Sequence, residues 1–177
     1  MKSLVDRLAS YAEYHRDKRN IATHFVGIPM ILVGTQAALA RVGIGPINAA
    51  VGATGLATRY YRALDPRFGN AMGVVLGATC AVGSTIAALP FPAFAGVAGG
   101  LFVGGWALQF LGHYFEGKKP AFLDDIKGLL DGPLFLLAEV AFALGLAPEL
   151  KEEVERRAGP TRWGKVAATD LAAAAAA

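Results

Sequence analysis

An unbroken apolar run over residues 21–40, "IATHFVGIPMILVGTQAALA", constrains the fold of this chain more than any other feature. A helix of that length spans about 30 Å, the thickness of the hydrocarbon core of a bilayer. The chain of 177 residues is 54% hydrophobic and 18% charged, whereas about a quarter of the residues in a soluble domain are charged. We therefore expect an integral membrane protein of the all-α class.

Further apolar segments predict a polytopic helix bundle with about four transmembrane helices. We expect the other spans at about residues 44–58, 70–89 and 93–112, followed by a re-entrant or short fifth helix over 133–147. The last segment is short for a full crossing and contains Glu139. Small residues at every fourth position predict close helix packing. They are Gly73, Gly77, Gly96, Gly100 and Gly104.

The N-terminal segment predicts a helix that lies along the membrane surface. Its apolar stripe consists of Leu4, Leu8, Tyr11 and His15, at steps of four, three and four residues. Together with the spans, this helix forms a single membrane-embedded domain with a core at about residues 4–146. Residues 147–177 are expected to form a cytoplasmic tail, which ends in an alanine run.

The basic residues predict the orientation of the bundle. They gather before the first span, after the second, after the fourth and in the tail, as Arg16, Lys18, Arg19, Arg59, Arg62, Arg67, Lys118, Lys119, Lys127 and the stretch "KEEVERR". Arg41 is the exception on the other side. Both termini are therefore expected in the cytoplasm. Because the positive charge flanks spans and forms no single stripe, we expect no nucleic-acid partner.

The three histidines of the chain all fall at the predicted cytoplasmic side, at His15, His24 and His113. On one straight helix His15 and His24 would point in opposite directions. A bend within "RDKRN" would bring them together, with Asn20 as the N-cap of the first span. Asn20 could instead hydrogen-bond a ligand, because it lies four residues before His24.

Gln109, His113 and Glu116 share one helical face at i, i+4 and i+7. Helical carboxylate-bridged iron sites use a Glu three residues from a His in this way. Glu116 is therefore a candidate metal ligand or supporting residue, although an ion pair with Lys118 or Lys119 would also explain it. Three imidazoles and a carboxylate suit Fe(II), Zn(II) or Mn(II). Taken singly, each histidine could equally be a polar anchor at the membrane interface.

Other types of chemistry lack their usual motifs. The sequence contains no GxSxG, P-loop, GxGxxG or CxxC pattern, which argues against serine hydrolase, nucleotide and thiol chemistry. The single cysteine, Cys80, lies in an apolar run and is expected to be buried. Glu139 is a carboxylate within an apolar segment, which makes it a candidate functional residue. It could support a metal-bound histidine.

The first half of the chain contains the pattern Tyr11-x3-His15-x4-Asn20-x3-His24-x2-Gly27-x-Pro29. It is followed downstream by "QFLGHYFEGKKPAF" and "GPLFLLAE". Together these motifs resemble the 2-hydroxy fatty acid dioxygenase family of small multi-span membrane proteins. The resemblance implies an Fe(II)-dependent enzyme of fatty acid α-oxidation, which converts a 2-hydroxy fatty acid and O2 to the fatty acid one carbon shorter. It also implies that His15, His24 and His113 hold the iron. The composition is typical of a bacterial member of the inner membrane.

The substrate of such an enzyme would keep its acyl chain among the spans. We expect Tyr11, Lys118 and Lys119 to bind it, with the lysines, or Arg19, meeting the carboxylate at the interface. Two alternatives stay open: a membrane protein that binds lipid or organises partners without catalysis, and a zinc-dependent membrane lipid hydrolase that uses the same ligands.

Overall fold

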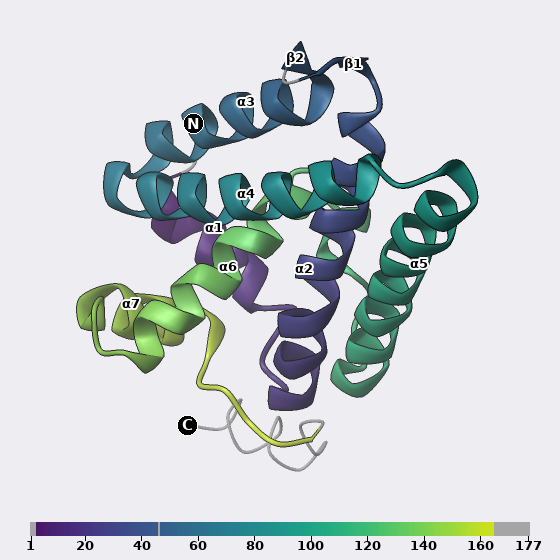
Figure 1. Cartoon of the computed structure of the whole chain (residues 1–177). Helices are drawn as coiled ribbons and strands as arrows, with labels where there is room; N and C mark the ends of the chain where they lie inside the picture. Colours follow the sequence, from purple (N-terminus) through teal and green to yellow (C-terminus); the bar gives the residue numbers. More distant parts are fainter. Residues whose placement is uncertain (1–2, 46, 165–177) are drawn as a thin grey trace, which may run out of the picture.

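The computed structural model describes residues 3–45 and 47–164 and is mostly helical, as the sequence predicts. The chain begins with α1 (Leu4–Ala12) and the long α2 (Lys18–Ala40). A two-stranded hairpin of β1 (Gly43–Ile44) and β2 (Ile47–Asn48) leads into α3 (Ala49–Leu64), α4 (Pro66–Ala87) and α5 (Phe91–Glu116). A short 3-10 helix, η1 (Ala121–Leu123), precedes α6 (Gly128–Ala143) and α7 (Pro148–Ala158). Figure 1 shows this order.

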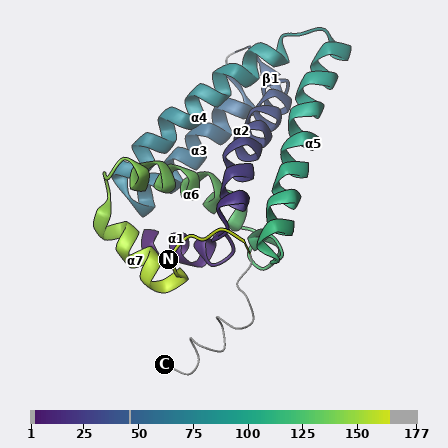
Figure 2. The ribbon, with the colours of Figure 1, turned by 90° about the horizontal axis from the view of Figure 1, so that it is seen from below.

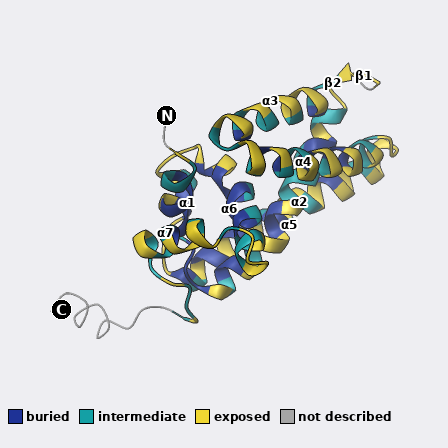
Figure 3. Ribbon diagram, turned by 90° about the vertical axis from the view of Figure 1, so that its left-hand side faces the viewer, coloured by how far each residue is buried: buried dark blue, intermediate teal, exposed yellow. Residues whose placement is uncertain are grey.

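Among the described residues, three helices are long and apolar enough to cross a membrane: α2, α4 and α5. The pair α6 and α7 passes the same test as one unit but is bent by 119°, which matches the predicted re-entrant or short fifth segment. Exposed apolar side chains cover the outer faces of the long helices, among them Val26, Val74 and Val103. Such faces suit contact with lipid, and in Figure 3 exposed residues, coloured yellow, recur along the helices.

The predicted second span is the element that differs most from the sequence expectation. Residues 43–48 form the β hairpin, in which Gly43 and Gly45 have positive φ angles of 135° and 56° that favour glycine. The helix then starts at Ala49, where the Asn48 side chain accepts a hydrogen bond from the Val51 amide at 3.1 Å. The 16 residues of α3 reach about 24 Å, too short for a straight crossing.

The helices that carry the histidines pack tightly against each other. Figure 2 shows α2, α3, α4 and α5 side by side, with α1 and α7 near the end away from β1. A Cβ on Gly105 of α5 would lie 2.7 Å from the Gly27 carbonyl oxygen of α2. A Cβ on Gly34 of α2 would likewise lie 2.9 Å from the Ala98 carbonyl oxygen of α5. These glycines let the two backbones approach.

The prediction that the regularly spaced glycines mark close helix packing is partly correct. A Cβ on Gly73 would lie 2.9 Å from Thr58 of α3, and one on Gly104 would lie 3.1 Å from Met30 of α2. Gly77, Gly96 and Gly100 face open space among the described residues. Their spacing alone therefore did not identify the packed face. Cys80 is buried, as expected.

The described part of the C-terminal tail is packed onto the core. The Arg157 guanidinium donates to the Asp6 carboxylate at 2.9 Å, which joins α7 to α1. Further on, the Arg162 amide donates to the Arg16 carbonyl at 2.8 Å, and the Lys18 amide donates to the Arg162 carbonyl at 2.9 Å. The alanine run at the end of the sequence lies outside the described residues.

Candidate metal centre

The turn between α1 and α2 positions His15. Helix α1 ends at Ala12, so His15 lies beyond the helical stripe in which the sequence analysis placed it. The His15 amide still donates to the Ala12 carbonyl at 2.9 Å. The carboxylate of Asp17, rather than Asn20, caps α2 by accepting from the Arg19 amide at 2.9 Å. The predicted cap was therefore wrong by three residues, because Lys18 and Arg19 already belong to the first helical turn.

The other two histidines come from the facing ends of α2 and α5. His24 lies in the second turn of α2, and His113 lies in the last turn of α5. Gly112 allows them to meet, because a Cβ there would contact the Asn20 and Thr23 side chains and lie 3.1 Å from His24 Nδ1. The prediction that Gln109, His113 and Glu116 share a helix is confirmed, since α5 continues to Glu116.

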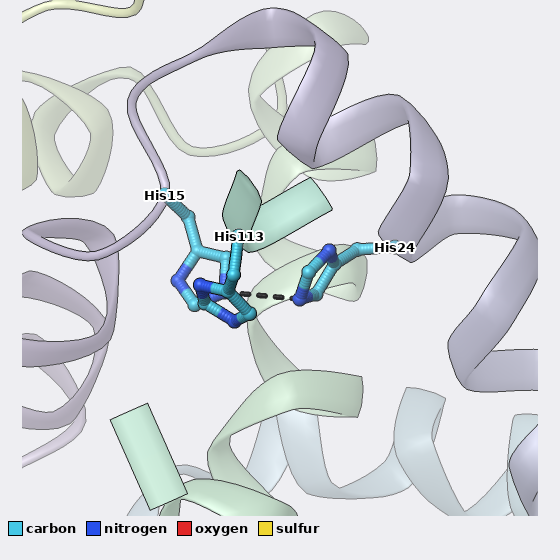
Figure 4. A group of neighbouring side chains, drawn as sticks. All are labelled: His15, His24 and His113. Atoms are coloured by element: carbon cyan, nitrogen blue, oxygen red, sulfur yellow. Dashed lines mark hydrogen bonds between the residues drawn. The ribbon is translucent and has the colours of Figure 1, made fainter. Parts of the chain in front are cut away.

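The three imidazoles form a compact buried cluster, and Figure 4 shows their rings converging. His15, His24 and His113 are 0%, 1% and 6% exposed. One ligand atom from each lies within 4.8 Å of the others. Burial of this kind does not suit three separate anchors at a membrane interface. The sequence expectation that the rings meet in space is therefore confirmed.

The hydrogen bonds of His15 and His24 fix which ring nitrogens are free. His15 Nδ1 lies 2.7 Å from the Tyr11 carbonyl oxygen, and His24 Nδ1 lies 2.9 Å from the Asn20 carbonyl oxygen. A carbonyl only accepts, so each Nδ1 carries the proton and each Nε2 of a neutral ring has a free lone pair. These two Nε2 atoms are 3.1 Å apart, marked in Figure 4.

Two lone pairs that face each other at this distance repel unless a cation lies near both. Imidazoles that ligate metals commonly donate their other N–H to a backbone carbonyl, as both rings do here. His15 favours its neutral form, because burial and the neighbouring histidines lower the pKa of its imidazole well below 6.5. The cluster therefore fits a divalent metal ion, with His113 as the third nitrogen donor.

Tyr11 supports the cluster from α1. Its ring stacks on that of His15, with 4.0 Å between the centroids and 5° between the planes. The ring of Phe135 in α6 packs against both, at centroid distances of 5.2 Å and 5.6 Å. The rotamer of His15 is thus fixed by stacking on one face and by the Tyr11 carbonyl at Nδ1.

Glu116 organises the turn that carries His15. Its Oε2 atom accepts from the backbone amides of Arg16 and Asp17, at 3.0 Å and 2.7 Å, and from Asn20 Nδ2 at 3.1 Å. Its Oε1 atom accepts from Arg162 at 3.0 Å. The structure gathers the three histidines, without Glu116, into the group of possible ligands. The position of Glu116 therefore favours a supporting role, and Asn20 belongs to the same network.

The remaining predicted residues lie away from the histidines. Lys118 Nζ donates to the Glu13 carbonyl at 2.8 Å, and Lys119 pairs with Asp124 at 2.5 Å, both at the surface. Arg19 pairs with Asp17 at 2.6 Å. Glu139 lies 3.8 Å from Arg16 instead of supporting a histidine. Contact of Lys118 and Lys119 with a substrate carboxylate stays a prediction.

An apolar pocket adjoins the cluster between α2, α5, η1 and α6. Tyr11, His24 and His113 line it, together with Gln109 and Trp106 of α5. The sequence analysis noted Gln109 only as a member of the histidine face, and it missed Trp106 and the structural role of Arg162. Apolar residues in a span look alike in sequence whether they face lipid or a pocket, so no signal marked Trp106.

Comparison with known proteins shows the family of the chain. The model of the family described as "2-hydroxy-palmitic acid dioxygenase Mpo1-like" matches residues 1–144. The chain is 32% identical over 156 residues to the 2-hydroxy-palmitic acid dioxygenase MPO1 of Saccharomyces cerevisiae. The aligned region covers 86% of this chain and 87% of the yeast protein. No solved structure matches the chain. On the family match and on this relative, the chain belongs to the Mpo1-like family of 2-hydroxy-palmitic acid dioxygenases.

Proposed function

We propose that this chain is an Fe(II)-dependent dioxygenase that converts a 2-hydroxy fatty acid to the fatty acid one carbon shorter. The observation that carries the proposal is the pair of free Nε2 lone pairs of His15 and His24, 3.1 Å apart. His113 completes a set of three buried nitrogen donors, which non-haem iron accepts readily. Family membership and the name of the yeast relative support the substrate class.

The proposed overall reaction balances without an added reductant. A 2-hydroxy acid and one O2 give the shorter acid, CO2 and water: R–CH(OH)–COOH + O2 → R–COOH + CO2 + H2O. The bond between the carboxyl carbon and C2 breaks, both carbons are oxidised, and O2 is the four-electron acceptor. Bound iron would supply the redox chemistry with O2, which no amino-acid side chain of the cluster supplies.

The residues of the chain hold and shield this chemistry. His15, His24 and His113 would hold the iron, and Tyr11 and Phe135 exclude water from the face of His15. Glu116 and Asn20 would hold the turn that carries His15. We place the protein in a bacterial inner membrane, with its termini and the histidine cluster at the cytoplasmic side.

The test is metal analysis of protein purified without oxygen, followed by O2 consumption with 2-hydroxypalmitate. We expect about one iron per chain in the wild type, and loss of both iron and O2 consumption in His24→Ala and His113→Ala. Tyr114→Phe is the matched control, because Tyr114 neighbours His113 in sequence but is 73% exposed. Zinc as the bound metal would support a hydrolase, and a metal-free active-site cluster would support lipid binding without catalysis.

A further inference from the structure

The pocket beside the histidines has a mostly apolar lining. His24, His113 and Gln109 contribute polar groups, and Ile28, Leu32, Trp106 and Leu129 contribute apolar walls. Trp106 packs edge-on against Phe122 of η1, with 5.2 Å between the ring centroids. Leu129 is 44% exposed, so the apolar lining continues to the outer surface of the protein.

Gln109 lines this pocket and carries an unused hydrogen-bond donor beside Gly27 of α2. The residue is 5% exposed, and its Nε2 atom is buried with no hydrogen-bond partner among the described residues. It lies one helical turn before His113, on the same face of α5. Gly27 of α2 leaves the space that the amide occupies, because a Cβ there would overlap Gln109 Nε2. A buried donor without a partner is costly, which indicates an acceptor supplied by a ligand.

We propose that this pocket binds the acyl chain of the substrate and that Gln109 donates a hydrogen bond to an oxygen at its polar end. The inference rests on the proposed function for the identity of the substrate, a long-chain 2-hydroxy acid. Such a molecule matches the composition of the lining: its oxygens suit the Gln109 amide and the histidines, which would form the polar end, and its hydrocarbon suits the apolar walls, which would form the other end. The exposed edge of Leu129 gives the chain a route from the lipid without passage through water.

The chain offers a reporter for binding, since Trp106 and Trp163 are its two tryptophans. In a Trp163→Phe background, the protein as purified without oxygen is titrated in detergent with a dibrominated C18 2-hydroxy acid, whose bromines quench a tryptophan that they contact. We expect saturable quenching of Trp106 that 2-hydroxypalmitate relieves. The Trp106→Phe protein, which retains the exposed Trp163, is the control and should show no saturable quenching. Quenching that never saturates in the Trp163→Phe protein would overturn the assignment of the pocket.

Gln109→Leu tests the polar end at nearly constant volume. We expect at least a fivefold loss of affinity for the brominated 2-hydroxy acid and no change for the matching dibrominated alkane. An equal loss for both would show that the substitution only disturbs the pocket. Unchanged affinity for the acid would remove the role of Gln109.

Two neighbouring residues of α6 test the apolar end even if Gln109→Leu does not fold. Leu129 lines the pocket, and Leu130, also partly exposed, does not. Leu129→Phe should shift the preferred competitor towards shorter 2-hydroxy acids by two or more carbons, whereas Leu130→Phe should leave the preference unchanged. The same result in both variants would contradict the proposal.

These binding measurements separate the inference from the proposed function. Saturable quenching in a protein that binds no iron and consumes no O2 would keep the pocket and remove the dioxygenase. Turnover of 2-hydroxypalmitate without saturable quenching of Trp106 would keep the dioxygenase and place the acyl chain elsewhere.

Discussion

At the scale of single residues, the cluster depends on contacts that orient the imidazoles before any metal binds. His15 is held by the Tyr11 ring, by the Tyr11 carbonyl and, through the backbone of the next two residues, by Glu116. Preorganisation of this kind reduces the entropy that metal binding must overcome. Residues that never touch the metal are therefore expected to affect its affinity.

Tyr11 allows the ring and the hydroxyl to be tested separately. Tyr11→Phe keeps the stacking on His15, so we expect the iron content to stay within about 20% of the wild type. Tyr11→Ala removes the ring, leaves a cavity beside His15, and should lower the unfolding free energy by about 3–5 kcal/mol together with the iron content. Metal analysis and thermal unfolding of both variants check this. Equal iron loss in both would show that the hydroxyl matters and the stack does not.

The burial of His15 predicts a pH dependence for the metal-free protein. The pKa of its imidazole is well below 6.5 when folded and about 6.5 in an unfolded chain. Below pH 6.5 the unfolded chain binds a proton that the folded protein does not. The unfolding free energy should therefore fall as the pH falls, by about 1.4 kcal/mol per pH unit from this residue. Thermal unfolding at pH 7 and pH 5.5 measures it, and His15→Gln should reduce the slope.

At the scale of elements, the close approach of α2 and α5 sets the distance between His24 and His113. The approach depends on Gly27 and Gly105, whose backbones are in contact. Gly27 lies about one helical turn from His24 in α2, and Gly105 lies about two turns from His113 in α5. Both residues occur in sequence patterns that any membrane helix could show. The packed face becomes visible only when the two helices are paired.

Gly105→Ala should push these helices apart. The new methyl group would lie 2.7 Å from both the Gly27 carbonyl oxygen and the Ile31 side chain, so we expect a loss of about 1–3 kcal/mol in stability and weaker iron binding. Gly100→Ala is the matched control, because Gly100 is in the same helix and faces open space. It should be neutral or slightly stabilising. Iron titration and thermal unfolding compare them, and equal effects would contradict the packing argument.

At the scale of the whole molecule, the sequence predicted what depends on composition and local pattern. The apolar runs predicted α2, α4 and α5, and the position of all three histidines at one predicted side of the membrane indicated the cluster. The prediction failed where local alternatives compete. Asp17 and Asn20 are both good caps, but Asp17 caps α2, whereas the Asn20 side chain donates to Glu116 and to the Tyr14 carbonyl. The pocket walls and Arg162 depend on long-range contacts, which no pattern within one element encodes.

The orientation of the bundle can be tested by cysteine labelling in a Cys80→Ala background. Lys127 and Ile47 are both exposed, one in the loop before α6 and the other in the β hairpin. The positive-inside rule predicts that Lys127→Cys faces the cytoplasm and Ile47→Cys faces the other side. A membrane-impermeant maleimide added to intact cells should therefore label only the second. Labelling of position 127 alone would reverse the topology.

The cluster takes two of its members from the turn after α1 and the second turn of α2, and the third from the last turn of α5, which lies much later in the sequence. During synthesis the N-terminal pair of donors therefore emerges from the ribosome long before the third one exists. A complete three-histidine site must await insertion of α5, so a chain interrupted before that helix would reach the membrane with only two of the three nitrogen donors.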